Sequence, residues 1–104
     1  METKEYLNRL PKGYEPFVSY LLKNGYTPIE EITTHIVLQK NIGNLYATII
    51  LDYLPKETAE CRISSDERMT HYSSCYIRCD TGLEDTIFPI AINKLMHHYN
   101  DGVF

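Results

Sequence analysis

Alternation of apolar and polar residues runs through the middle of the chain and predicts four β-strands. The most apolar segment, Leu45 to Leu54, has apolar side chains on both of its faces, which is typical of a central strand. Strands are also expected over Thr33 to Lys40, Thr58 to Ser64 and Tyr72 to Asp80, where the pattern has a period of two. Short links between consecutive strands predict an antiparallel meander.

Helical periodicity flanks this region on both sides. Pro16 suits the first turn of a helix, and the apolar stripe that follows it ends at Asn24-Gly25. That stripe comprises Phe17, Val18, Leu21 and Leu22. Further along, an extended Phe88 is expected to lead into a last helix that Pro89 opens. The buried stripe of this helix comprises Ile92, Leu95, Met96 and Tyr99.

Two shorter segments also have helical signals. Thr3 to Leu10 could form a short helix that Pro11 ends. The sequence Thr27-Pro28-Ile29-Glu30 is a capping box with proline at the first position, so a single helical turn is expected there. The expected fold is α+β: an N-terminal helix, a four-stranded antiparallel meander and a C-terminal helix, with both helices on one face of the sheet. The 104 residues fit a single domain over 1–104.

Composition narrows the class of protein. Hydrophobic residues make up 43% and charged residues 23% of the chain, which is ordinary for a globular domain and argues against disorder. No apolar run approaches the roughly 18 residues of a membrane span, and no signal-peptide core follows Met1. We therefore expect a cytoplasmic protein with no membrane partner. The net charge of -4 marks a small acidic protein and opposes non-specific binding to nucleic acid.

Thiol and imidazole groups are the first candidates for chemistry. Cys61, His71, Cys75 and Cys79 follow the spacing C-x9-H-x3-C-x3-C, which lacks the tight C-x2-C knuckle of structural zinc sites. On one strand, Cys75 and Cys79 would lie about 13 Å apart, too far to share one ion. No metal, cofactor or catalytic group is therefore expected. The alternation instead predicts the cysteines to be small apolar core residues, and their odd number fits a reducing compartment.

The opposite face of the same strands has a different character. It carries Arg62, Tyr72, Tyr76 and Arg78. Stacking rings and cations of this kind bind single-stranded nucleic acid on open sheets, but Glu60 and Asp80 share the face and the net charge has the wrong sign. Tyrosine and arginine are also enriched in protein interfaces. A solvated face with ordinary cross-strand pairs is the third interpretation.

Three hypotheses of function follow. The first is a non-enzymatic protein-binding module, a regulator, inhibitor or adaptor that docks through its Tyr-rich sheet face or a sheet edge and forms a homodimer. The lack of a catalytic constellation favours it, and abundant Ile, Asn, Lys and Tyr are typical of a low-GC genome such as that of a phage or mobile element. The second is a single-stranded nucleic-acid binder using Arg62, Tyr72, Tyr76 and Arg78. The third is a small metal- or thiol-dependent enzyme around His71 and Cys75.

Overall fold

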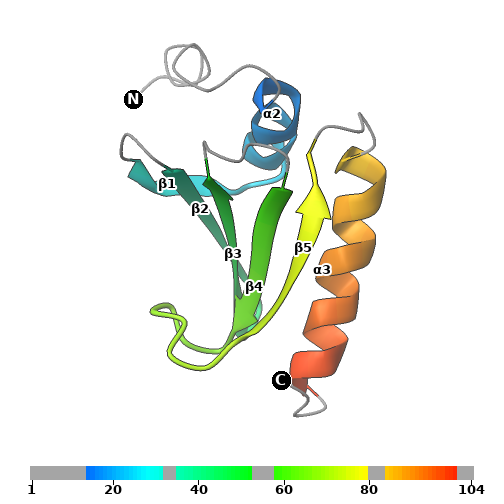
Figure 1. Cartoon of the computed structure of the whole chain (residues 1–104). Coiled ribbons are helices and arrows are strands. Elements are labelled where there is room, and N and C mark those ends of the chain that lie inside the picture. The colour runs from blue at the N-terminus through cyan, green and yellow to red at the C-terminus, as the bar shows by residue number, and fades with distance from the viewer. Residues whose placement is uncertain (1–13, 32–34, 53–57, 80–83, 101–104) are drawn as a thin grey trace.

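A five-stranded antiparallel sheet organises the computed structural model, which describes residues 14–31, 35–52, 58–79 and 84–100. The strands lie in chain order, so every strand pairs with its neighbours in sequence (Figure 1). The elements are α2 (Glu15–Lys23), β1 (Thr27–Glu31), β2 (His35–Ile42), β3 (Leu45–Asp52), β4 (Thr58–Ser64), β5 (Ser73–Arg78) and α3 (Glu84–Asn100). The predicted α+β class and antiparallel meander are confirmed, with one more strand than expected.

The register of the sheet separates its side chains into two faces. Leu38, Ile49, Cys61 and Cys75 are successive cross-strand partners on β2, β3, β4 and β5. Because side chains alternate along a strand, every second residue from these positions points to the same side. These residues, together with the buried side chains of both helices, make one hydrophobic cluster. This side of the sheet is therefore the core face.

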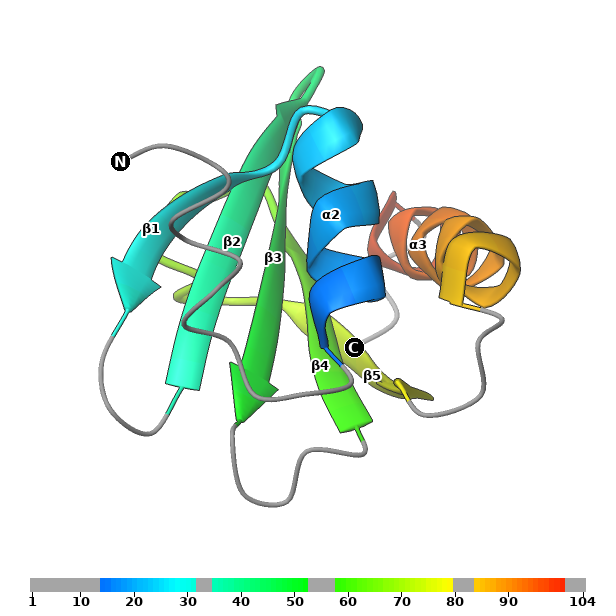
Figure 2. The same ribbon diagram turned by 90° about the horizontal axis from the view of Figure 1, so that it is seen from above.

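The two helices contribute to the core in different ways. Helix α3 packs along β4 and β5, whereas α2 lies at the end of the sheet where β4 begins (Figure 1, Figure 2). The predicted arrangement, with both helices laid on one face, therefore differs in detail. The Tyr14 hydroxyl, next to the start of α2, donates a hydrogen bond to the Asp52 carbonyl at the end of β3. Neither described helix is long and apolar enough to span a bilayer.

Aromatic contacts join the helices to each other. The ring of Phe88 on α3 lies 5.5 Å from that of Phe17, 6.1 Å from that of Tyr20 and 5.6 Å from that of Tyr26, each in an edge-to-face arrangement. Such pairs add to the free energy gained by burying the rings. Burial also raises the pKa of the Tyr26 phenol, so this ring remains neutral. Phe88 is thus the shared contact of α3, α2 and the segment that enters β1.

Two local predictions were wrong. Thr27 to Glu31 forms strand β1 rather than a helical turn, because it pairs with β2, with an irregularity after Pro28. Pro28 is tolerated there because β1 is an edge strand. Pro89 lies inside α3 rather than at its start, and Phe88 is helical rather than extended. Burial of Phe88 among the aromatic rings outweighs the local preference before proline.

The predicted boundaries of the other strands agree with the structure to within about two residues, the usual uncertainty of such assignments. Helix α2 begins one residue before Pro16 and ends just before Asn24, as expected. Gly25 follows with φ +90, a conformation that side chains rarely adopt. The proposed helix over Thr3 to Leu10 lies outside the described residues.

Replacement of Phe88 tests this account of the core. Phe88→Ala removes the ring that α2 and α3 share, and we expect the free energy of unfolding to fall by about 3–5 kcal/mol. Ile90→Ala is the matched control, because Ile90 lies on the same helix and is 65% exposed. Urea unfolding monitored by circular dichroism measures both variants. Equal losses in the two variants would contradict the placement of α3.

Candidate functional site: the open face of the sheet

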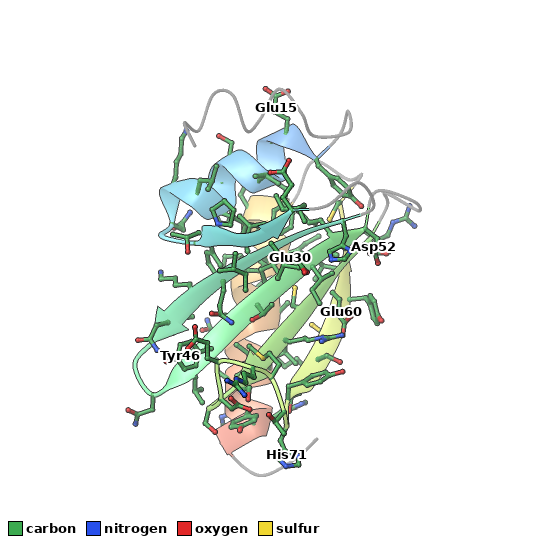
Figure 3. The ribbon with its side chains drawn as sticks, turned by 90° about the vertical axis from the view of Figure 1, so that its left-hand side faces the viewer. Glu15, Glu30, Tyr46, Asp52, Glu60 and His71 are labelled. Carbon is green, nitrogen blue, oxygen red and sulfur yellow. The ribbon has the colours of Figure 1, made fainter. Side chains whose placement is uncertain are left out.

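The face of the sheet opposite the core is here called the open face. In the described residues no helix packs on it, and Figure 3 views it with α3 behind the strands. Its residues on β2 to β5, by register, are His35, Val37, Gln39, Asn41, Tyr46, Thr48, Ile50, Asp52, Thr58, Glu60, Arg62, Ser64, Ser74, Tyr76 and Arg78. One row across the sheet runs through Val37, Ile50, Glu60 and Tyr76. The open face therefore combines apolar, aromatic and charged groups.

Arg62 on β4 is held on two sides. Its Nε donates to Glu60 Oε2 at 2.6 Å and its Nη2 donates to Glu60 Oε1 at 3.0 Å, a two-point pair between residues two apart on one strand. The guanidinium carbon also lies 4.4 Å from the centre of the Tyr72 ring, a cation–π distance. The hydrogen bonds that Arg62 donates to Glu60 raise the pKa of its guanidinium further. The Arg62 guanidinium is therefore fixed in position, and its charge is neutralised by the salt bridge with Glu60.

Tyr76 and Arg78 project from the neighbouring strand β5. Tyr76 is opposite Glu60 and 69% exposed, which is unusual for a large aromatic side chain on a sheet. Arg78 is opposite Thr58 and is also exposed. The structure thus brings the four residues singled out in the sequence onto β4, β5 and the connection between them. They differ in character, since Arg62 and Tyr72 pack together while Tyr76 extends into solvent.

Carboxylates are distributed across the same face. Glu60 forms a salt bridge with Arg62. On β1, Glu30 Oε2 lies 2.9 Å from His35 Nε2. Asp52 is exposed at the end of β3, and Figure 3 shows Glu30, Asp52 and Glu60 along one side of the sheet. Asp80, which the sequence also placed here, lies outside the described residues. The open face therefore has mixed charge instead of a continuous basic surface.

The connection from β4 to β5 covers one end of the open face. Gln39 and Thr48 lie on this face, yet they are only 8% and 4% exposed. Gln39 Nε2 donates to Thr48 Oγ1 at 3.0 Å and to the Glu67 carbonyl at 3.1 Å, so the connection is bonded to the sheet. Sequence reasoning missed this contact. The polar character of Gln39 and Thr48 does not by itself predict it, because β2 also contains His35, Lys40 and Asn41.

Side-chain hydrogen bonds shape that connection. Ser64, fully buried, donates from Oγ to the His71 carbonyl at 2.5 Å and accepts from the Asp66 amide at 3.0 Å. The Asp66 carboxylate in turn accepts from the amides of Arg68 and Thr70. Hydrogen bonds from Thr70 and Arg68 lower the pKa of the Asp66 carboxyl. The connection is therefore an ordered turn that brings Tyr72 back onto Arg62.

An open depression lies between this connection and the end of α3. It is lined by Thr70, His71, Tyr72 and Tyr99. The Tyr99 hydroxyl accepts a hydrogen bond from the Ser65 amide at 3.0 Å and contacts Ser65 Oγ at 2.9 Å. These bonds lower the pKa of Tyr99 and attach α3 to the connection. The depression is therefore a feature of the packing between α3 and the β4–β5 connection, which the Tyr99–Ser65 hydrogen bonds hold together.

The cysteines lie on the core face. Cys61 and Cys79 are 0% and 3% exposed, which confirms their prediction as core residues, while Cys75 is half-buried. His71 is exposed at the far end of the molecule, on the β4–β5 connection (Figure 3). Cys75 lies on the core face of β5, directly opposite Cys61. The enzyme hypothesis requires His71 and Cys75 to act together, whereas the structure places His71 on the exposed connection and Cys75 within the strand.

Within residues 14–31, 35–52, 58–79 and 84–100, no three His, Cys, Asp or Glu side chains are grouped so that they could hold one metal ion. No protein-family model matches the chain, and no curated protein or solved structure shows significant similarity to it. Function therefore has to be inferred from the residues of the open face themselves.

Substitution of Ser64 tests how the connection is held. Ser64→Ala leaves the Asp66 amide and the His71 carbonyl without their partner, and we expect a loss of about 1–3 kcal/mol in the free energy of unfolding. Amide hydrogen exchange should also become faster at Asp66. Ser74→Ala on the exposed side of β5 serves as the control and should change little. Unchanged exchange at Asp66 in Ser64→Ala would show that the connection is held by other contacts.

Proposed function

We propose that the protein is a non-enzymatic protein-binding module, a regulator, inhibitor or adaptor, and that the open face is its docking surface. The observation that carries the proposal is Tyr76, a large aromatic side chain that is 69% exposed beside the paired Arg62 and Tyr72. Tyrosine and arginine dominate the binding energy of protein interfaces, because each combines a large contact area with a polar tip.

The fixed geometry of Arg62 supports a protein partner. Binding a flexible side chain costs conformational entropy at the moment of association. Arg62 has lost that freedom already, because Glu60 holds its guanidinium at two points and Tyr72 lies against it. Apolar Ile50 occupies the same cross-sheet row as Glu60 and Tyr76. A preorganised centre with apolar and charged neighbours is what a specific interface requires.

Single-stranded nucleic acid is the less favoured ligand. Phosphate contacts depend on cations that are free to replace counterions, and Arg62 is already paired with Glu60. Glu30 and Asp52 add negative charge to the same side of the sheet, and the net charge of the chain is -4. The nucleic-acid hypothesis requires salt-dependent affinity for an oligonucleotide that Arg62→Ala/Arg78→Ala abolishes. No affinity at low salt would exclude it.

A homodimer through a sheet edge is part of the same proposal. Strand β5 is at one edge of the described sheet, and edge strands can pair with a second copy of the chain. Native mass spectrometry at micromolar concentration distinguishes monomer from dimer. We also propose a cytoplasmic location, since three free thiols fit a reducing compartment.

Photo-crosslinking tests the docking surface before the partner has been identified. A photoreactive amino acid replaces Tyr76 on the open face in one variant and Ile90 on α3 in the other, and each variant is irradiated in the native host. Both positions are similarly exposed, so a difference in crosslinking reflects which surface contacts the partner and not how accessible the residue is. We expect one discrete crosslinked product from position 76 and none from position 90. The reverse result would place the docking surface on α3.

Affinity for the crosslinked partner gives the energetic test. Tyr76→Ala removes the exposed ring without removing core volume, and we expect Kd to rise by at least about tenfold, as for interface hot spots. Ile90→Ala should leave Kd unchanged. Circular dichroism confirms that both variants are folded. If Tyr76→Ala binds as tightly as the unaltered protein, Tyr76 is not an anchor of the interface.

A further inference from the structure

Two of the three cysteines are direct neighbours across adjacent strands. Cys61 on β4 and Cys75 on β5 are register partners, and both lie on the core face. Residues directly opposite each other in an antiparallel pair have Cα atoms about 4.5 or 5.5 Å apart, and both values lie within the span of a disulfide. Cys79 follows the end of β5 and has no cysteine as a register partner. The backbone therefore places one pair of thiols, and only that pair among the three, in position to form a bond.

The two thiols differ in access and in charge. Cys61 is fully buried, whereas Cys75 is half-buried at the edge strand. The neighbouring Cys61 thiol across the strands and the Lys94 ammonium of α3 both favour the thiolate form of Cys75. These two effects lower the pKa of the Cys75 thiol to about 7, although burial opposes them. The neighbouring Cys75, burial and the charges of Cys79 and Glu60 raise the pKa of Cys61.

We propose that Cys61 and Cys75 form a thiol–disulfide exchange site whose substrate is a low-molecular-weight disulfide. Cys75, the accessible thiol, is the attacking group, and Cys61, directly opposite it, is the resolving group. This site lies on the core face and does not depend on the docking surface of the open face.

The reaction balances in two steps. The Cys75 thiolate attacks one sulfur of the small disulfide, which forms a mixed disulfide at Cys75 and releases the other half as a thiolate. The Cys61 thiol then loses its proton to that thiolate or to water and attacks the Cys75 sulfur. The Cys61–Cys75 bond forms and the second half of the small disulfide leaves as a thiolate, which takes up from water the proton that Cys75 had released there. The protein dithiol is oxidised by two electrons, and the small disulfide is reduced to two thiols.

Oxidation would join the two strands directly behind the open face. Cys61 is adjacent in sequence to both Glu60 and Arg62, and Cys75 is adjacent to Tyr76. A disulfide between them fixes the distance between β4 and β5 and closes the loop that contains the β4–β5 connection. Because loop closure restricts the unfolded chain, the oxidised protein should unfold at a higher temperature than the reduced protein.

Reaction of the folded, reduced protein with oxidised glutathione tests the proposal. Intact-mass spectrometry should show loss of two hydrogen atoms without a lasting adduct, and peptide mapping should identify a Cys61–Cys75 link. Cys79→Ala, the matched control, should react in the same way. Cys61→Ala should stop at the first step and accumulate one glutathione adduct on Cys75. If Cys61→Ala fails to fold, the mass change and the mapped link in the unaltered protein are sufficient to test the proposal.

The pH dependence provides a second readout of the same reaction. Only the thiolate attacks, so the initial rate of glutathione incorporation should rise as the pH increases through about 7 and then level off. Lys94→Met removes a positive charge that lowers the pKa of Cys75, and we expect the midpoint to move to higher pH. Each of three results with the unaltered protein overturns the proposal: a persistent mixed disulfide, a link to Cys79, or no reaction while the protein is folded.

Discussion

The pairing of β3 between β2 and β4 is the constraint on which the rest of the structure depends. Leu38, Ile49 and Cys61 meet across these three strands, and each is fully buried. Their register decides which side of every other strand faces the helices, because side chains alternate with a period of two. A shift of one residue would expose this row and bury Arg62 and Glu60. The hydrophobic core and the polar surface are therefore consequences of one alignment.

The same alignment gives the two faces of β4 and β5 different chemical character. On the core face, Cys61 and Cys75 are opposed thiols on the two strands that α3 packs against. Arg62 and Tyr76, which follow these cysteines in sequence, lie on the open face together with Tyr72. Within the described residues, no helix covers this surface. The proposed docking surface and the proposed thiol site are thus separated by the thickness of one sheet. Each can be altered by substitution without removing the residues of the other.

Sequence patterns predicted the features that depend on neighbouring residues. Alternation located four of the strands, assigned the cysteines to the core side and placed Arg62 and Tyr76 on the opposite side. Strand β1 and the start of α3 were missed, because Pro28 and Pro89 are local helix signals whereas pairing with β2 and burial of Phe88 are tertiary. The contact between Gln39 and the Glu67 carbonyl spans 28 positions and leaves no periodic trace. The opposition of Cys61 and Cys75 likewise required the register of β4 with β5.

We propose that the partner contacts the open face and not the helical side. Hydroxyl-radical footprinting of the affinity-purified complex, compared with the free protein, tests this claim most directly, because Tyr76 and Ile90 are both accessible when the protein is alone. The account predicts that the partner strongly slows oxidation of Tyr76 and leaves that of Ile90 unchanged. Protection of Ile90 with no change at Tyr76 would contradict it.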